Sequence, residues 1–141
     1  LYRPVTNGAH KIDFFGHSGE EKAVYAFEVK TKRRRALKCD TGFNYSNFTH
    51  YEEIRKKHNI NTFIFFVDVH EAKIYGQWLH KLENPKIENG IIYWSLDQMK
   101  VIRELTEYEL NSISTYSREN YDYSKTPRFF KANFTQNTTA P

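Results

Sequence analysis

Three ionisable residues in the first quarter of the chain have the types and spacing for phosphate chemistry. Glu28 and Lys30 stand at alternate positions of an apolar run, so they project from the same face if this run is a strand. If the hairpin is centred between Glu20 and Glu21, Asp13 lies opposite Glu28, because the two positions are equidistant from that centre. We therefore expect two carboxylates and one ammonium group at a single place.

Two converging carboxylates would suit a hard divalent cation, Mg²⁺ or Mn²⁺, which relieves their mutual repulsion. Asp13 and Glu28 are the expected ligands, and the backbone carbonyl of Val29 could complete the shell. Such a cation stabilises charge on a phosphate and lowers the pKa of an attacking water, while Lys30 would orient that water or the phosphate. The trio thus predicts metal-dependent hydrolysis of a phosphodiester. The alternative is a solvated ion pair on an edge strand, which would contribute little.

Basic residues gather next to this candidate site. The chain has 141 residues, a formal charge of +4 and a pI near 9.1, and five lysines and arginines lie between Lys30 and Arg35. This clustering favours a polyanionic partner, DNA before a membrane, with RNA left open. The residues expected to contact nucleic acid are Lys32, Arg33, Arg34, Arg35, Asn44, Tyr51 and Arg55.

Each of these contacts has a plainer alternative. The basic run could be a solvated loop or a localisation signal. Arg55 would in any case complement the dipole at a helix end, and Asn44 has the chemistry of a turn residue. Phosphate contacts would hold the backbone of the nucleic acid without reading its sequence.

The pattern of apolar residues predicts the elements that position the trio. We expect strands near His10–Phe15 and Ala23–Lys30, then a loop rich in Asn, Gly and Ser after Cys39. A helix is expected to begin at a capping box at Thr49 and to end near His58. Strands are then expected at "NTFIFFVDV", "AKIYGQWL" and "GIIYWS". Ser95 is expected to cap a helix beginning "LDQMKVIREL", and Thr106 a short helix to about Ser114.

This order predicts an α/β (α+β) fold with a central mixed sheet flanked by helices. The strand that carries Glu28 and the strand "NTFIFFVDV" are expected to be parallel, because the chain between them is long enough for a helical crossover. Residues 1–117 are expected to form one domain, and residues 118–141 a polar tail. The single cysteine, Cys39, suggests an intracellular protein, and no apolar run is long enough to span a membrane.

An aspartate followed fifteen residues later by Glu-x-Lys at the end of an apolar strand resembles the PD-(D/E)XK nuclease superfamily, which has the restriction-endonuclease-like fold. The match covers roughly Lys11 to Leu79. By this resemblance Asp13 and Glu28 would be metal ligands and Lys30 the catalytic lysine of a Mg²⁺-dependent endo- or exodeoxyribonuclease. A homodimer is also expected by resemblance, since many members pair to cut both strands.

The sequence departs from the superfamily pattern at two points. Ile12 rather than proline precedes Asp13, and residues 1–12 contain no acidic residue, whereas many members carry a glutamate on a helix before the first strand. Either that helix lies upstream, or the site functions with fewer carboxylates. Two other functions therefore stay open: a catalytically weak or inactive nucleic-acid-binding module of the same fold, and a small structural or partner-binding domain.

Overall fold

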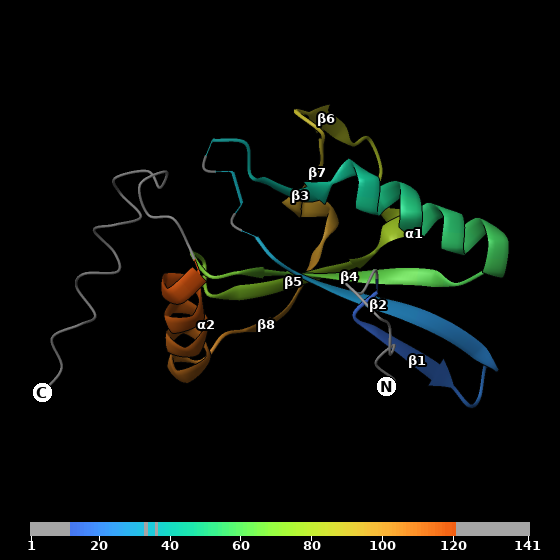
Figure 1. Cartoon of the computed structure of the whole chain (residues 1–141), viewed down its shortest axis with the longest axis horizontal. Helices are drawn as coiled ribbons and strands as arrows, with labels where there is room; N and C mark the ends of the chain where they lie inside the picture. Colours follow the sequence, from blue (N-terminus) through green and yellow to red (C-terminus); the bar gives the residue numbers. More distant parts are fainter. Residues whose placement is uncertain (1–11, 33, 36, 121–141) are drawn as a thin grey trace, which may run out of the picture. The chain divides into compact units, whose positions relative to one another are not determined.

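The computed structural model describes residues 12–32, 34–35 and 37–120 (Figure 1). The chain divides into two compact units, Leu1–Thr106 and Glu107–Pro141. In the described part of the chain, no helix is both long enough and apolar enough to cross a membrane.

A mixed five-stranded sheet forms the frame of the first unit, in the order β1-β2-β4-β5-β8. Its strands are β1 (Phe14–Ser18), β2 (Ala23–Thr31), β4 (Asn61–Asp68), β5 (Lys73–Trp78) and β8 (Lys100–Glu104). Strands β2 and β4 are parallel, and all the other neighbours are antiparallel. The predicted mixed sheet and the predicted parallel pair are confirmed.

A second, three-stranded sheet follows the order β3-β7-β6, with β3 (Asp40–Asn44), β7 (Ile91–Ser95) and β6 (Lys86–Glu88). Strand β3 occupies a segment where the sequence suggested a loop. Its pairing is close at Gly42, where an added Cβ would lie 1.9 Å from the backbone oxygen of Ile92. Glycine is needed there because the neighbouring backbone leaves no room for a side chain.

The crossover between β2 and β4 contains helix α1 (Tyr45–His58), which ends where predicted but begins four residues before Thr49. The predicted capping box is wrong, because the Thr49 hydroxyl donates to the Ser46 carbonyl at 2.8 Å inside the helix. Strand β3 leads directly into α1 through Asn44, whose backbone is not helical. The helix ends at His58, and the next residue, Asn59, adopts the left-handed conformation common after helix ends.

The helix predicted after Ser95 is also wrong. A short 3-10 helix, η2 (Leu96–Gln98), is followed by β8, which pairs with β5. Pairing with an existing strand satisfies the backbone of this segment, and its β-branched pair, Val101 and Ile102, suits a strand. A second 3-10 helix, η1 (Leu79–Lys81), follows β5.

The two ends of the described chain also differ from the prediction. Strand β1 begins at Phe14 rather than near His10, and residues 10 and 11 lie outside the described part. Helix α2 (Glu107–Asn120) begins after Thr106 as predicted and continues past Ser114. The predicted boundary between residues 117 and 118 stays a prediction.

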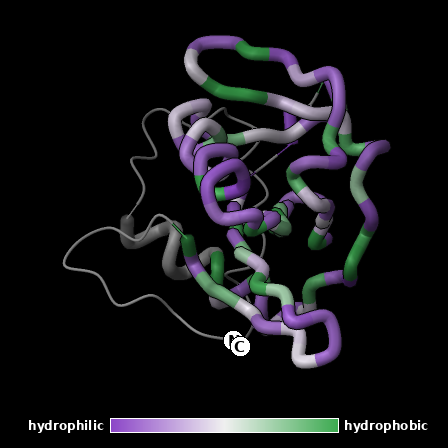
Figure 2. The backbone as a smooth tube through the Cα atoms, turned by 90° about the vertical axis from the view of Figure 1, so that its right-hand side faces the viewer, coloured by the Kyte–Doolittle hydropathy of each residue, from purple (hydrophilic) through white to green (hydrophobic). Residues whose placement is uncertain are grey.

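The core of the first unit lies between one face of the large sheet, helix α1 and the small sheet. Helix α1 contacts β4, β3 and β7, and Figure 1 shows it on the same side of the large sheet as the small one. The fully buried side chains are largely aromatic or branched: Trp94, Tyr51, Phe43, Phe66, Ile64 and Ile92. Helix α1 is predominantly hydrophilic (Figure 2), and Tyr51 is its buried residue.

Candidate functional site

Asp13 and Glu28 meet at the open end of the β1–β2 hairpin. The pair Phe14–Phe27 has the register that the sequence predicted, and the next positions outward are Asp13 and Glu28. The Asp13 N–H donates to Glu28 Oε2 at 3.1 Å, and the Val29 N–H donates to Asp13 Oδ2 at 2.8 Å. Each carboxylate is therefore held by a backbone amide of the opposite strand.

Lys30 joins this pair from the same face of β2. Its Nζ forms an ion pair with Glu28 Oε1 and lies 5.7 Å from the ring centre of Phe43 and 5.9 Å from that of Tyr51. Glu28 is only 4% exposed, and β2 is bonded to a strand on each side. The alternative of a solvated edge-strand pair is thus wrong: Glu28 is buried, Lys30 is partly buried, and two aromatic rings flank the lysine.

Tyr51 completes the surroundings of Glu28. It is 2% exposed, and its pKa is raised well above the ordinary value for tyrosine. Burial is the largest cause of this pKa shift, followed by the charge of Glu28, a hydrogen bond to Glu28 and the charge of Asp13. The phenol therefore stays protonated and can donate to the carboxylate. Its burial places Tyr51 beside the carboxylates, where it has no surface to stack on a nucleic acid base.

Phe43 was missed in the sequence analysis because its segment was taken for a loop. It is 1% exposed, and its ring lies 5.8 Å from that of Tyr51 and 5.5 Å from that of Trp94. The segment "DTGFN", whose first four residues are all buried, is too short for its pattern to separate a strand from a loop. Pairing with β7 makes this segment a strand, and the 5.7 Å distance from Lys30 Nζ to the ring centre places Phe43 at the candidate site.

The donor set of Asp13 and Glu28 suits a hard cation. Mg²⁺ in proteins is commonly held by one or two carboxylates, together with water and substrate phosphates. Each carboxylate oxygen has two lone pairs, so an oxygen that accepts one N–H keeps acceptor capacity. Across the residues that the structure describes, no group of three or more His, Cys, Asp or Glu side chains could hold a metal ion. The Val29 carbonyl as a ligand stays a prediction.

The basic residues after Lys30 differ in their exposure and in the contacts that they make. Lys32 is exposed, and its backbone N–H donates to the Val67 carbonyl at 3.2 Å. Arg34 forms a partly exposed ion pair with Glu71. Arg33 lies outside the described residues.

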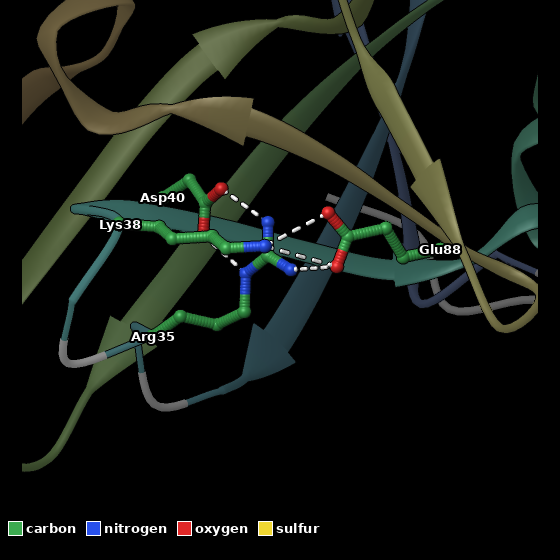
Figure 3. A network of polar contacts seen from close by, with 4 residues as sticks. All are labelled: Arg35, Lys38, Asp40 and Glu88. Atoms are coloured by element: carbon green, nitrogen blue, oxygen red, sulfur yellow. Dashed lines mark hydrogen bonds and ion pairs between the residues drawn. The ribbon is translucent and has the colours of Figure 1, made fainter.

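Arg35 belongs to a network of charged side chains (Figure 3). Its guanidinium binds both carboxylate oxygens of Asp40, reaches Glu88 Oε2 at 2.5 Å and lies 3.7 Å from the ring centre of Tyr93. Lys38 adds a second ion pair to Glu88 at 2.9 Å. The interactions of Arg35 thus join β3 to β6, so this residue has a structural role in place of the expected free phosphate contact.

Asn44 and Arg55, the last two predicted contacts, are not adjacent in the fold. Asn44 is exposed at the end of β3, and no hydrogen bond from its side chain caps α1. Arg55, on the last turns of α1, forms an ion pair with Glu52 at 2.8 Å, which raises the pKa of the guanidinium. Neither side chain is buried, so phosphate contacts by both stay predictions.

Comparison of the chain with protein-family models, with curated proteins and with solved structures finds no match in any of the three.

Proposed function

We propose that this chain is a metal-dependent nuclease that hydrolyses DNA phosphodiester bonds at a site of the PD-(D/E)XK type. The observation that carries the proposal is the meeting of Asp13, Glu28 and Lys30, from two adjacent strands, at one end of a hairpin. The surrounding order also supports it, because the resemblance implies a helix and then an apolar strand after Glu-x-Lys, and α1 and β4 occupy those places.

The three residues would have distinct roles. Asp13 and Glu28 would hold Mg²⁺ or Mn²⁺ through hard oxygen donors. The bound cation would supply charge stabilisation at the phosphate and acidify a water molecule. Lys30, held between Glu28 and the rings of Phe43 and Tyr51, would orient the water or the phosphate. Lys32 and Arg34 follow on the same chain segment and would bind the phosphate backbone.

The test is cleavage of labelled linear, nicked and branched DNA, and of RNA, by the purified chain with Mg²⁺, with Mn²⁺ or with EDTA. We expect metal-dependent cleavage that Asp13→Asn and Glu28→Gln each lower by at least about a hundredfold, because each removes a ligand charge. Glu20→Gln is the matched control, since this exposed carboxylate lies in the turn between β1 and β2, at the opposite end of the hairpin from the trio. Circular dichroism would verify that each variant is folded. Cleavage that survives in both site variants would refute the proposal.

A second candidate is a nucleic-acid-binding module without catalysis. It is favoured by the ion pair between Lys30 and Glu28, which occupies one of the two described carboxylates of the site. This candidate predicts binding that is retained in EDTA, weakens with salt and is accompanied by no cleavage in any metal. A homodimer and an intracellular location complete the proposal, the first by resemblance and the second from the single cysteine.

A further inference from the structure

Glu28, one of the two carboxylates proposed to hold a metal ion, has a partner at each of its oxygens. Its Oε1 forms an ion pair with Lys30 Nζ, and its Oε2 accepts the Asp13 N–H at 3.1 Å. The side chain of Tyr51 also forms a hydrogen bond with this carboxylate. A carboxylate oxygen keeps a lone pair after one such contact, but one of these partners, Lys30, is itself a cation.

The charge of Lys30 opposes the binding of a second cation at Glu28. Asp13 and Glu28 carry two negative charges and Lys30 one positive charge, which leaves a net charge of −1 for a divalent cation to compensate. Two cations at one carboxylate repel each other, and solvent screens this repulsion poorly because Glu28 is only 4% exposed. A backbone N–H or a phenol has no net charge and does not oppose the cation in this way.

Lys30 is also the partner of Glu28 that can move. The Asp13 N–H is part of the backbone, and the Asp13 carboxylate is held in turn by the Val29 N–H at 2.8 Å. Tyr51 is 2% exposed and packs with its ring 5.8 Å from that of Phe43. The Lys30 ammonium, in contrast, ends a flexible four-carbon stem, and its side chain is 16% exposed. Lys30 therefore has the mobility and the contact with solvent that an exchange requires.

Two aromatic rings offer Lys30 a second set of contacts. Its Nζ lies 5.7 Å from the ring centre of Phe43 and 5.9 Å from that of Tyr51. Both distances are within the range of about 6 Å in which an aromatic ring attracts a cation. These contacts do not depend on the Glu28 carboxylate, so they are retained if the ion pair breaks.

We propose that the Lys30 ammonium and a divalent cation compete for Glu28, so that Lys30 sets the metal affinity of the site and is released from the carboxylate when the cation binds. This inference rests on the proposed nuclease function and concerns the regulation of the same site. The released ammonium stays beside the rings of Phe43 and Tyr51, where it is free to bind a phosphate oxygen. The lysine then becomes available to a substrate only together with the metal.

The experiment measures the binding of Mn²⁺ to the full chain without DNA, by the loss of the electron paramagnetic resonance signal of free Mn²⁺. Lys30→Gln removes the charge but keeps a hydrogen-bond donor near Glu28, so that the buried carboxylate is not left without a partner. We expect this variant to bind Mn²⁺ about tenfold more tightly than the parent chain, because a like charge beside the cation is removed.

Lys57→Gln is the matched control. Lys57 is exposed in the last turn of α1, and its replacement changes the net charge by the same amount. This variant should bind Mn²⁺ as the parent does. Circular dichroism would verify that both variants are folded.

A second measurement follows Lys30 in the parent chain. Each ¹³C-labelled lysine gives its own Cε–Hε signal in a nuclear magnetic resonance spectrum, and the signal that disappears in Lys30→Arg belongs to Lys30. Addition of Mg²⁺ should shift the Lys30 signal more than that of any other lysine. A Lys30 signal that stays unchanged while the backbone amides of Asp13 and Glu28 shift would overturn the proposal.

The failure of this inference and the failure of the proposed function are distinguishable. If neither the parent nor Lys30→Gln binds Mn²⁺, both are overturned. If the parent binds Mn²⁺ and cleaves DNA but Lys30→Gln binds Mn²⁺ no more tightly, only the competition is overturned. An equal gain in Lys57→Gln would also overturn the competition, because the effect would then come from net charge. Tighter binding by Lys30→Gln, with no cleavage of DNA by the parent, would support the competition and overturn the nuclease function.

Discussion

Glu28 is buried and forms an ion pair with the partly buried Lys30, whose Nζ lies 5.7 Å from the ring centre of Phe43 and 5.9 Å from that of Tyr51. A buried charge is tolerated only with a partner, so neither residue can be removed without affecting the other. This pair links the stability of the fold to the chemistry of the candidate site.

Lys30→Met should therefore lower the free energy of unfolding by about 3–5 kcal/mol, because it leaves a buried carboxylate without its partner. The double variant Lys30→Met/Glu28→Gln should recover much of this loss, since no charge then stays uncompensated. Urea unfolding of the single and double variants measures the coupling. Arg55→Met, which breaks an exposed pair on α1, is the control and should cost at most about 1 kcal/mol. If the free energy of unfolding of the double variant fell by the sum of the two single losses, Lys30 and Glu28 would not be coupled, and the prediction would be wrong.

Tyr51 should make the fold sensitive to alkaline pH. Burial raises its pKa in the folded state above the ordinary value of 10.0, so above pH 10 the unfolded chain loses a proton that the folded chain keeps. The stability contributed by this group is complete below pH 10 and declines as the pH rises towards the folded-state pKa. At pH 11 the loss relative to pH 8 should be about 1.4 kcal/mol.

Tyr51→Phe removes the titrating group, so its unfolding free energy should fall less between pH 8 and pH 11 than that of the parent. Urea unfolding at several pH values measures the difference between the two curves. Tyr108→Phe is the control, because Tyr108 is 81% exposed. Parallel curves for the parent and Tyr51→Phe would show that the folded and unfolded states titrate alike at this residue.

Arg35 and Arg34 are neighbours in sequence with different expected contributions. Arg35→Met leaves Asp40, which is 5% exposed, without its partner, and should lower the free energy of unfolding by about 3 kcal/mol. Arg34→Met breaks a more exposed pair with Glu71 and should cost at most about 1 kcal/mol. Thermal or urea unfolding ranks the two variants, and an equal cost would show that the Arg35 network contributes no more than a surface ion pair.

Gly42 should not tolerate any side chain. A Cβ at this position would lie 1.9 Å from the Ile92 backbone oxygen, so Gly42→Ala must separate β3 from β7 and should cost about 3 kcal/mol or more. Gly19→Ala is the matched control, since nothing lies within 4 Å of the added carbon, and its stability should stay within about 0.5 kcal/mol of the parent. Equal melting temperatures for the two variants would mean that the sheets adjust around the new methyl group.

The sequence by itself determined the parts of the fold that depend on local pattern. The two-residue periodicity of strands and the position of the turn set the register of β1 and β2, and hence the meeting of Asp13 with Glu28. The apolar run of β4 and the length of chain before it determined the parallel pair and its crossover helix. Both inferences need only distances along the chain and the geometry of regular elements.

Only the tertiary structure decided which charges are buried and which segments pair at long range. Glu28 and Lys30 are enclosed because β3 and α1 bring Phe43 and Tyr51 over them. Arg35 has a structural role because its guanidinium donates a hydrogen bond to Glu88, which lies 53 residues further along the chain. Residues 100–104 became a strand because β5 offered unpaired backbone groups. In each case the partner is distant in sequence, and local propensity and periodicity contain no information about a distant partner.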